Sequence, residues 1–440
     1  MTKILVIGAG RSATSLIDYL FEHAAMYHWQ LTVADMDIRL AQSKVPANSN
    51  AVAIGFDIND KAQRQATIQQ HDFVISMLPA FMHGDVARDC VQFGKSMATA
   101  SYVSADMRAL DEAAKQKGLI LINECGLDPG LDHASAMKMI DDIHAQGGKI
   151  KTFKSYCGGL VAPQSNDNPW GYKFSWNPRN VVLAGQGTAQ YLEDGSLKFI
   201  PYNRLFTQTD SIEVTGYGAF DAYANRDSIG YKEIYHLKDV QTMLRGTLRQ
   251  KGYCKAWNVL LKLGLTDDSS KISNADALTY AGLVRAFLPT SKLNIVDQVK
   301  TIMGQDWDAE VEHKLNWLEI FSDKKIKLKE GSPAQILQAL LEEKWLLKPE
   351  DKDMIVMQHQ ISYEDNQQQQ KHISSSLVLE GKNQNHTAMA LTVGLPLAIT
   401  VKNYLSKKFT LSGVQIPTVS AIYKPMLDEL EQMGIQFIEQ

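Results

Sequence analysis

The stretch Ile4–Ala13, ILVIGAGRSA, decides the fold of the first part of this chain. An apolar run ends at Gly8, and the pattern G-x-G-x-x-A then opens a helix-like segment. Gly8 permits a tight turn, Gly10 lets the backbone approach a pyrophosphate, and Ala13 allows close packing of helix on strand. Free N–H groups at the helix start attract an anion. We therefore predict a dinucleotide contact through Gly8, Gly10, Arg11, Ser12 and Ala13; a glycine turn without ligand is the alternative.

Strand-like and helix-like segments alternate over the first third of the chain. The apolar runs are Ile4–Ile7, Leu31–Val33, Ala51–Ile54, Phe73–Ile75, Ser96–Thr99 and Ile120–Ile122. The helix-like stretches between them include Ser12–Ala24, Asp60–Gln70, Met82–Phe93 and Ala105–Lys117. Such alternation indicates parallel strands joined by right-handed crossovers. The predicted fold class is α/β, with a Rossmann doubly wound dinucleotide-binding domain.

The rest of the chain has a different pattern. Residues 149–235 are strand-rich, and residues 239–344 are predicted to be helical. The helices expected there are Val240–Gln250, Tyr253–Leu263, Asn274–Phe287, Asp306–Ile320 and Pro333–Lys344. Met354–Ser362 and Ser374–Glu380 are typical of strands, and the polar tract Asp365–Lys371 between them predicts an exposed hairpin turn. The segment after His386 is helical again, and we expect this tail to pack on the first domain.

Composition excludes several classes of protein. The 440 residues carry 45 Lys+Arg against 49 Asp+Glu, so the net charge of -4 gives no electrostatic footprint for nucleic acid. No apolar run reaches the roughly 20 residues of a membrane span, and the N-terminus has no signal-peptide pattern. The four cysteines fit no zinc or redox spacing. We expect a cytoplasmic protein with free thiols, no metal, no nucleic-acid partner and no membrane contact.

An acidic residue at the end of the second strand bears on the choice of cofactor. Asp35 lies about 20 residues beyond the glycine loop, where a carboxylate accepts hydrogen bonds from the adenosine ribose and repels a 2′-phosphate. The sequence therefore predicts NAD rather than NADP. Arg39 complicates this prediction, because a guanidinium there can stack on adenine or pair with a phosphate. Asp35 capping the next helix is the alternative, and Asp57 is expected near adenine.

Further cofactor contacts are expected at the carboxyl ends of later strands, because ligands bind at that edge of such sheets. The residues predicted there are Leu78, Ala100, Leu127, Asp128 and Pro129.

Several unusual motifs resemble one enzyme family along the whole chain. They are Gly126–His133 (GLDPGLDH), Ser155–Leu160 (SYCGGL), Asp167–Trp176 (DNPWGYKFSW), Asn225–Ser228 (NRDS), Arg245–Arg249 (RGTLR) and Thr392–Pro396 (TVGLP). Together they resemble the L-glutamate-forming saccharopine dehydrogenases, also called saccharopine reductases. The resemblance implies oxidation of saccharopine with NAD(P)+ and water to L-glutamate and 2-aminoadipate 6-semialdehyde, or imine reduction in reverse.

The resemblance also implies an architecture. Residues 1–128 form the dinucleotide domain, completed by 386–440; residues 129–238 and 346–385 form an α/β substrate and dimerisation domain; and 239–345 form a helical subdomain. It further implies a homodimer. Because the chain begins at the first strand of the dehydrogenase, we expect it to lack the lysine–ketoglutarate reductase half of fused versions.

Saccharopine carries three carboxylates, so its site needs fixed cations. A guanidinium binds a carboxylate in a bidentate fork. The resemblance places Arg226 and Arg249, with Thr247 and Leu248, in the substrate site, and Ser101 lies on the loop that leads to it. Arg245 is a weaker candidate, equally compatible with a surface ion pair.

The steps after hydride transfer need proton transfer within hydrogen-bond reach. The resemblance puts Tyr102, Asp128 and Cys157 beside the scissile C–N bond. Asp128 is expected to position the amine and tune charge, and Tyr102 to orient the imine or relay a proton. Cys157 is a candidate relay, although a buried cysteine is more often inert. Core packing is the default expectation for the aromatic residues Trp170, Phe174 and Trp176. A wall for the nicotinamide or the substrate is the sharper option, and Trp176 is the cofactor-contact candidate. A structural hydrogen-bonding role is expected for His133.

Two other functions stay open at this point. An imine reductase similar to carboxynorspermidine synthase shares the scaffold, but its polyamine substrate would favour an acidic site and not Arg226 and Arg249. A non-catalytic nucleotide-binding protein is the second alternative, although the glycine loop and Asp128 are both retained.

Overall fold

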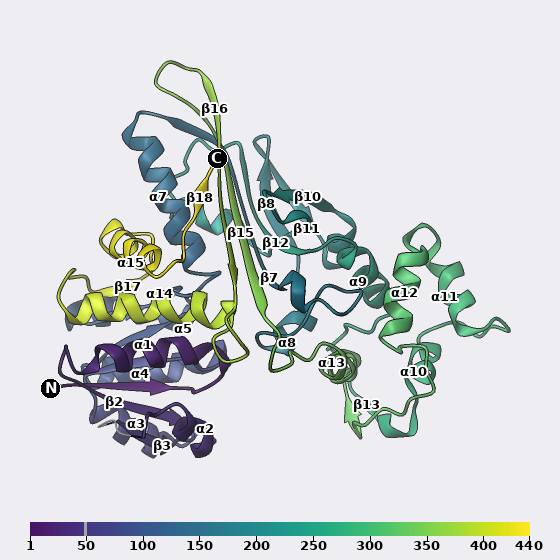
Figure 1. Cartoon of the computed structure of the whole chain (residues 1–440), viewed down its shortest axis with the longest axis horizontal. Helices are drawn as coiled ribbons and strands as arrows, with labels where there is room; N and C mark the ends of the chain where they lie inside the picture. Colours follow the sequence, from purple (N-terminus) through teal and green to yellow (C-terminus); the bar gives the residue numbers. More distant parts are fainter. Residues whose placement is uncertain (48–50) are drawn as a thin grey trace. The chain divides into compact units, whose positions relative to one another are not determined.

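The computed structural model describes residues 1–47 and 51–440, which divide into two compact units (Figure 1). Unit 1 contains Met1–Lys149, Asp365–Gln369 and Leu377–Ile438, and unit 2 contains Ile150–Glu364, Gln370–Ser376 and Glu439–Gln440. The expected domain boundary at residue 128 lies inside unit 1. The chain therefore crosses from one unit to the other more than once.

Unit 1 is built around a seven-stranded parallel sheet with the order β17-β6-β5-β4-β1-β2-β3. The strands are β1 (Thr2–Ile7), β2 (Trp29–Asp35), β3 (Val52–Gly55), β4 (Phe73–Ser76), β5 (Ser96–Thr99), β6 (Ile120–Ile122) and β17 (Gly413–Gln415). The first six strands have the order of a doubly wound dinucleotide fold, so the predicted class is confirmed. The seventh, β17, comes from the C-terminal part of the chain and pairs with β6.

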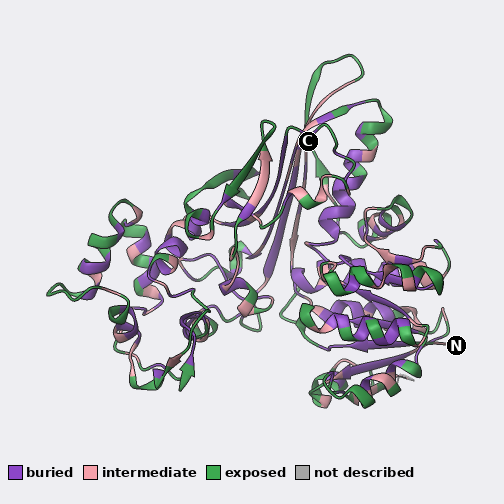
Figure 2. Ribbon diagram, turned by 180° about the vertical axis from the view of Figure 1, so that it is seen from behind, coloured by how far each residue is buried: buried purple, intermediate pink, exposed green. Residues whose placement is uncertain are grey.

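The helices of unit 1 bury their apolar faces against this sheet. They are α1 (Thr14–Ala24), α2 (Ile38–Ser43), α3 (Lys61–Gln69), α4 (His83–Gln92), α5 (Ala105–Ala109), α6 (Asp111–Gln116), α7 (Leu131–Ala145), α14 (Ala388–Leu405) and α15 (Ser420–Gln432). One core cluster joins Leu5 and Ile7 of β1 to Ile68 of α3 and Val86 of α4. Figure 2 shows the strands and inner helix faces buried and the outer helix faces exposed. Alternate residues of a strand point to opposite faces, which is why helices cover both.

Helix α14 is the most apolar helix of unit 1. By length and composition it is the one described helix that passes the test for crossing a membrane, but 78% of its 18-residue window is buried inside the protein. It lies beside α1 (Figure 1). At their contact, a Cβ added to Gly394 would lie 2.8 Å from the backbone nitrogen of Leu16. Its apolar character is therefore that of a core helix.

Unit 2 contains most of a nine-stranded mixed sheet, with the order β10-β11-β12-β7-β15-β16-β18 and with β8 and β9 branching from β12. The strands are β7 (Lys149–Val161), β8 (Ala189–Glu193), β9 (Ser196–Ile200), β10 (Thr209–Val214), β11 (Gly218–Ala224), β12 (Thr242–Gln250), β15 (Asp353–Glu364), β16 (Gln370–Glu380) and β18 (Ile438–Glu439). The helices are α8 (Pro178–Val182), α9 (Tyr253–Lys262), α10 (Tyr280–Ala286), α11 (Ile295–Met303), α12 (Ala309–Trp317) and α13 (Pro333–Lys344). A short pair, β13 (Ile272–Ser273) and β14 (Glu330–Gly331), lies among them.

The predicted helix at Val240–Gln250 is wrong, because Thr242–Gln250 forms strand β12. Its apolar residues do fall at helical spacing. However, β12 lies inside the sheet between β11 and β7, and seven of its nine residues are buried, on both faces of the sheet. A strand buried on both faces shows no alternation and is easily mistaken for a buried helix. Helix α11 was not predicted at all. It is short, and one of its sides is mostly exposed.

The polar tract at residues 365–371 turns the chain between β15 and β16, as predicted. The backbone N–H of Asp365 donates to the carbonyl of Gln369 at 2.9 Å, and the Asp365 carboxylate accepts from the N–H groups of Gln367 and Gln369. Gln368 takes a positive φ of 60°. The tract is therefore an ordinary hairpin turn held by an aspartate.

Candidate active site

The glycine loop lies at the carboxyl end of β1. Gly8 has a φ of 99°, and a Cβ there would lie 2.9 Å from the carbonyl oxygen of Met77 at the end of β4. A Cβ at Gly10 would meet nothing within 4 Å, so space for a ligand adjoins this backbone. A 3₁₀ turn at Arg11–Ala13 leads directly into α1. Since β2 and β4 flank β1 on opposite sides, the loop lies at the switch point where such sheets bind dinucleotides.

Asp35 ties the end of β2 to the glycine loop. One carboxylate oxygen accepts the N–H of Ala9 at 2.8 Å, and the other accepts the N–H of Asp37 at 3.0 Å. Each oxygen is thus already bonded to a backbone donor. Helix α2 is capped by Asp37 instead. The alternative role predicted for Asp35, as a helix cap, is therefore wrong.

Arg39 and Arg11 lie on the exposed surface near the loop. The Arg39 side chain is 85% exposed, and its guanidinium pairs with Asp37 at 3.1 Å. Stacking on adenine and pairing with a phosphate are both still open to Arg39. Asp57 accepts the N–H of Asn59 at 2.9 Å in an exposed turn after β3. Its contact with adenine stays a prediction.

The carboxyl ends of β4, β5 and β6 carry the other residues predicted to bind cofactor. Leu127 and Pro129 are buried, whereas Leu78, Ala100 and Asp128 are partly exposed. These residues are held in unit 1 with the glycine loop. Their adjacency follows from the parallel sheet, in which all carboxyl ends share one edge.

Tyr102 and Asp128 meet in unit 1. The phenol of Tyr102 donates to the Asp128 carboxylate at 3.0 Å. Asp128 projects from a tight loop in which Gly126 N–H donates to the Pro129 carbonyl at 2.9 Å. Only glycine fits at Gly130, since its φ is 145° and a Cβ would lie 2.2 Å from the Gly126 nitrogen. The loop therefore presents Asp128 in a fixed orientation next to Tyr102.

Two buried histidines adjoin these residues. The imidazole of His83 contacts the hydroxyls of Ser76 at 2.9 Å and Ser101 at 2.8 Å. Burial lowers the pKa of His83 to about 4, so the ring is neutral at physiological pH. His133 is 0% exposed and contacts Glu124 at 2.9 Å, which confirms its expected structural role.

Sequence reasoning missed His83 and Glu124. Both follow the end of a strand in the sequence, and this position is the feature that could have singled them out. Their contacts join separate loops, however, and linear spacing does not reveal such contacts.

In unit 2, one face of the sheet gathers the residues predicted to bind substrate. Arg245, Thr247 and Arg249 alternate along β12 and therefore share a face. Cys157 of β7 is the register partner of Thr247 in the parallel pair, so it points the same way. Leu248 points to the other face, and only its backbone is available: its carbonyl accepts from the Arg249 guanidinium at 3.1 Å.

Arg249 is the most unusual residue of this face. It is 3% exposed and lies over the rings of Tyr172 (5.3 Å), Tyr253 (5.4 Å) and Tyr223 (5.8 Å). Its Nε has no hydrogen-bond partner in the part of the chain that the structure describes. Burial raises the pKa of Tyr172 and of Tyr223, so these phenols stay neutral and supply no counter-charge. A buried guanidinium with unused hydrogen-bonding capacity is suited to bind an anion.

The other two arginines differ from Arg249. Arg226 is exposed on the loop after β11, where its carbonyl accepts the Gln190 N–H at 2.7 Å. Arg245 is 4% exposed and lies 4.4 Å from the centre of the Tyr231 ring. Arg245 therefore resembles a packed residue, and Arg226 is free to reach toward solvent.

Some aromatic residues of the motif at 167–176 pack in the core, and others lie beside Arg249. Trp170 and Phe174 are buried, as their expected default of core packing requires. Trp176 is half-buried, and its indole N–H donates to the Tyr172 phenol at 3.1 Å, next to Arg249. Its contact with a nicotinamide stays a prediction.

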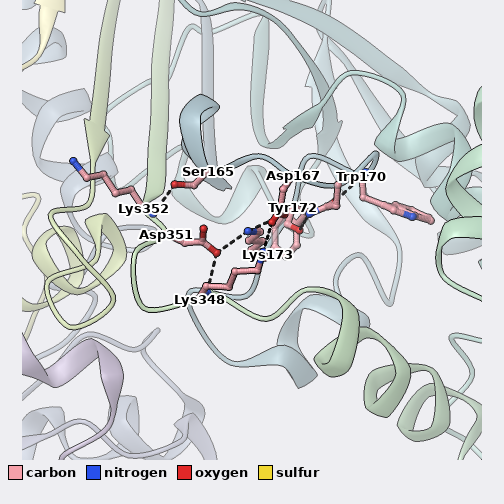
Figure 3. A network of polar contacts seen from close by, with 9 residues as sticks. Ser165, Asp167, Trp170, Tyr172, Lys173, Lys348, Asp351 and Lys352 are labelled. Atoms are coloured by element: carbon pink, nitrogen blue, oxygen red, sulfur yellow. Dashed lines mark hydrogen bonds and ion pairs between the residues drawn. The ribbon is translucent and has the colours of Figure 1, made fainter.

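A buried ion pair fixes this motif in place (Figure 3). Lys173 is 2% exposed, and its ammonium group bonds Asp351 at 2.6 Å and Asp167 at 2.8 Å. Figure 3 shows Lys173 next to Tyr172 in the chain, with Asp351 facing it from a separate segment. The pair thereby anchors the segment that carries Tyr172, one of the tyrosines whose rings lie beside Arg249. Among the residues described, no group of three or more His, Cys, Asp or Glu side chains has metal-binding geometry.

Two family models match the chain. The saccharopine dehydrogenase NADP binding domain matches residues 4–122, and the saccharopine dehydrogenase C-terminal domain matches residues 126–435. The Pyricularia oryzae protein named saccharopine dehydrogenase (NADP+, L-glutamate-forming) is 36% identical over 99% of this chain and 98% of its own length. The protein of that name from Saccharomyces cerevisiae is 33% identical over 99% of this chain and 98% of its own length.

Longer proteins and a solved structure extend these similarities. The mitochondrial alpha-aminoadipic semialdehyde synthase of Mus musculus is 33% identical over 99% of this chain, which spans 47% of that protein. The solved structure of apo, histidine-tagged saccharopine dehydrogenase (L-Glu forming) from Saccharomyces cerevisiae is similar with a TM-score of 0.90. It is 32% identical and covers 100% of this chain and 99% of the solved one.

These findings correct the predicted cofactor. The preference for NAD is wrong, because the matching domain model and the similar full-length proteins are named for NADP. Asp35 accepts two backbone N–H groups, so its carboxylate has a role in the glycine loop whichever cofactor binds. An acid at this position therefore does not by itself select NAD.

The two models together span most of the chain, and the similar proteins align along their whole length. The fold agrees with the solved structure. The chain belongs to the saccharopine dehydrogenase family of oxidoreductases.

Proposed function

We propose that this chain is an NADP-dependent, L-glutamate-forming saccharopine dehydrogenase. It converts saccharopine, water and NADP+ to L-glutamate, 2-aminoadipate 6-semialdehyde, NADPH and a proton, and it also catalyses the reverse reaction in lysine metabolism. The observation that carries this proposal is the buried Arg249 guanidinium in a neutral tyrosine cage, within a chain similar to these enzymes over its full length.

The glycine loop fits a dinucleotide, since nothing lies within 4 Å of a Cβ built at Gly10 and a pyrophosphate can approach the backbone there. Gly8, Gly10 and the start of α1 would hold that group. Arg39 and Arg11 are exposed near the end of β2 and are assigned to the 2′-phosphate. When bound, NADP+ accepts the hydride from the carbon next to the saccharopine nitrogen.

We assign the substrate carboxylates to Arg249 and Arg226. Arg249 offers a desolvated and preorganised fork, which strengthens each charge-assisted hydrogen bond. Arg226 is exposed to solvent, so its contribution is smaller. Thr247 lies between Arg245 and Arg249 on the same face and supplies a hydroxyl.

The chemical steps are assigned to Asp128 and Tyr102. The Asp128 carboxylate orients the reacting amine and stabilises positive charge on it, while the Tyr102 phenol relays a proton during hydration of the imine. Their hydrogen bond at 3.0 Å supports this coupling. Cys157 lies beside Thr247, where a thiol is a modest proton relay at most.

The first test is absorbance of reduced nicotinamide with L-saccharopine and NADP+. Arg249→Met should raise KM for saccharopine about 10- to 150-fold, because a hydrogen bond to a charged group contributes roughly 1.5–3 kcal/mol. Arg249→Lys should recover little, since an ammonium lacks the fork. Arg204→Met, an exposed arginine of the same unit, is the matched control and should leave kinetics unchanged. Turnover by wild type with unaltered KM in Arg249→Met would remove Arg249 from the site, and no turnover at all would overturn the function.

The assembly and cellular location belong to the same proposal. A cytoplasmic homodimer is supported by the resemblance to the family, with the sheet of unit 2, including β12, as the dimerisation domain and residues 251–345 as a helical subdomain. Light scattering coupled to gel filtration tests the dimer, because a mass near the 49.1 kDa of one chain would contradict it.

A further inference from the structure

His83 joins the ends of two neighbouring strands through its side chain. Its Nδ1 contacts the Ser76 hydroxyl at the end of β4, at 2.9 Å. Its Nε2 contacts the Ser101 hydroxyl just beyond β5, at 2.8 Å, and the Thr99 hydroxyl at 3.2 Å. His83, Ser76 and Thr99 are at most 3% exposed. The imidazole therefore bridges a hydroxyl in the core to one beside the candidate site.

A second buried contact holds the other side of Tyr102. The Glu124 carboxylate accepts the N–H of Val103 at 2.9 Å, and its second oxygen contacts His133 at 2.9 Å. The backbone N–H of Glu124 donates to the Ser101 carbonyl at 2.9 Å. Glu124 has a φ of 52°, a conformation that costs about 1–3 kcal/mol and persists where the surroundings impose it. Tyr102 thus lies between Ser101 and Val103, and a buried network fixes each of these two neighbours.

We propose that His83 is a positioning residue that, together with the Glu124–His133 pair, holds residues 101–103 so that the Tyr102 phenol meets Asp128. This inference rests on the proposed function, because it concerns how that reaction is supported. His83 contacts Ser101 and does not itself reach the reacting atoms.

A neutral imidazole suits this task. It offers one donor and one acceptor on opposite sides of a rigid ring, so it links two hydroxyls at a fixed separation. The surrounding groups bonded to it are hydroxyls and not carboxylates. The ring accordingly acts as a strut between two strand ends and not as an acid or base.

A second buried histidine, next to the other end of β4, provides a matched control. His71 precedes β4, as His83 follows it, and is likewise buried at 6% exposure. It contacts the Thr32 hydroxyl at 2.9 Å and the Thr67 carbonyl at 2.7 Å. Because it lies at the amino end of the strand, its loss should affect stability but not the carboxyl edge, where ligands bind.

Two substitutions at His83 separate its two contacts. In His83→Gln the side-chain amide reaches about the place of Nε2 and keeps the link to Ser101. In His83→Asn the amide reaches about the place of Nδ1 and keeps only the link to Ser76. His83→Asn should lower kcat about 10- to 100-fold, since small displacements of a reacting group have effects of that size. His83→Gln should recover kcat to within about fivefold of wild type, and His71→Asn should leave kcat within about twofold.

A double-mutant cycle tests whether Tyr102 mediates the effect. If His83 acts through the Tyr102 phenol, His83→Asn should lower kcat less than about threefold in a Tyr102→Phe background. An undiminished effect in that background would overturn the proposal.

Amide hydrogen exchange gives a readout that needs no turnover. In His83→Asn the peptide covering residues 100–104 should exchange at least about tenfold faster than in wild type, and His71→Asn should leave that peptide unchanged. Equal exchange and equal kcat in the two variants would overturn the inference.

Failure of wild type to oxidise saccharopine would overturn the proposed function alone, because the exchange comparison still decides the positioning role. If His83→Asn does not fold, Ser76→Ala, which removes the buried anchor of the ring, takes its place in both measurements.

Discussion

Asp35 illustrates how a single carboxylate misleads when its partners are unknown. Its two oxygens accept the N–H groups of Ala9 and Asp37, so it organises the loop whichever cofactor binds. Asp35→Ala should lower the free energy of unfolding by about 1–3 kcal/mol, because two backbone donors lose their acceptor. The ratio of kcat/KM for NADP+ to that for NAD+ should change less than about threefold, which corresponds to only about 0.6 kcal/mol. Steady-state kinetics with both cofactors measures the ratio, and Asp323→Ala, at an exposed position of unit 2, is the control. A tenfold shift toward either cofactor would restore a discriminating role to Asp35.

His83 also has a consequence for acid stability. Its pKa is about 4 in the folded protein because of burial, against an ordinary value near 6.5. As pH falls, the unfolded chain binds the proton first, so the stability contributed by the neutral ring is complete above about pH 6.5 and is lost toward pH 4. Between pH 7.5 and 5 this loss amounts to about 2 kcal/mol.

Urea denaturation at the two pH values measures the effect. In His83→Gln the decrease in unfolding free energy from pH 7.5 to 5 should be smaller by about 2 kcal/mol than in wild type. His313→Gln, at an exposed position of α12, should behave as wild type. An identical decrease in His83→Gln would mean that the ring is not held neutral.

At the scale of the element, α14 and the glycine loop give a paired prediction. A Cβ at Gly394 would lie 2.8 Å from the Leu16 nitrogen, so Gly394→Ala should cost about 1–3 kcal/mol of stability through overpacking. Gly10→Ala meets open space and should cost less than about 1 kcal/mol. NADPH titration should reverse the order, with Gly10→Ala the weaker binder. Loss of stability without loss of affinity in Gly10→Ala would argue against a pyrophosphate at that position.

The elements also show what the sequence made predictable. Strands β1 to β6 follow from short apolar runs bounded by helices, because a parallel sheet covered on both faces requires that pattern. Strand β12 is equally buried, but the spacing of its apolar residues matched a helix by coincidence. Tyr102 and Asp128 follow predicted strand ends, and the resemblance to the family singled out Arg249; their roles stay predictions. The contacts of Asp35 and the bridge through His83 depend on side chains from separate strands, and a one-dimensional pattern contains no information about them.

At the scale of the whole molecule, cofactor binding is linked to global stability. A ligand that binds the folded chain at 100 times its Kd stabilises it by about 2.7 kcal/mol. NADPH should therefore raise the melting temperature measurably, and NADH at the same concentration should raise it less. Differential scanning fluorimetry tests this, with Gly10→Ala as the control that removes the shift. Equal shifts from both dinucleotides would contradict an NADP enzyme.

The chemistry of the four thiols has a practical consequence for measuring motion. Cys90, Cys125, Cys157 and Cys254 are all buried, and burial raises the pKa of Cys90, Cys125 and Cys254. Thiolates are the reactive form, so maleimide dyes should modify the native protein slowly. Cysteines introduced at exposed Gln92 of α4 and Lys300 of α11 would then carry a donor and an acceptor fluorophore without removal of any natural thiol. Energy transfer between such a pair would report, in a single molecule and in real time, how the two compact units respond to saccharopine and NADP+.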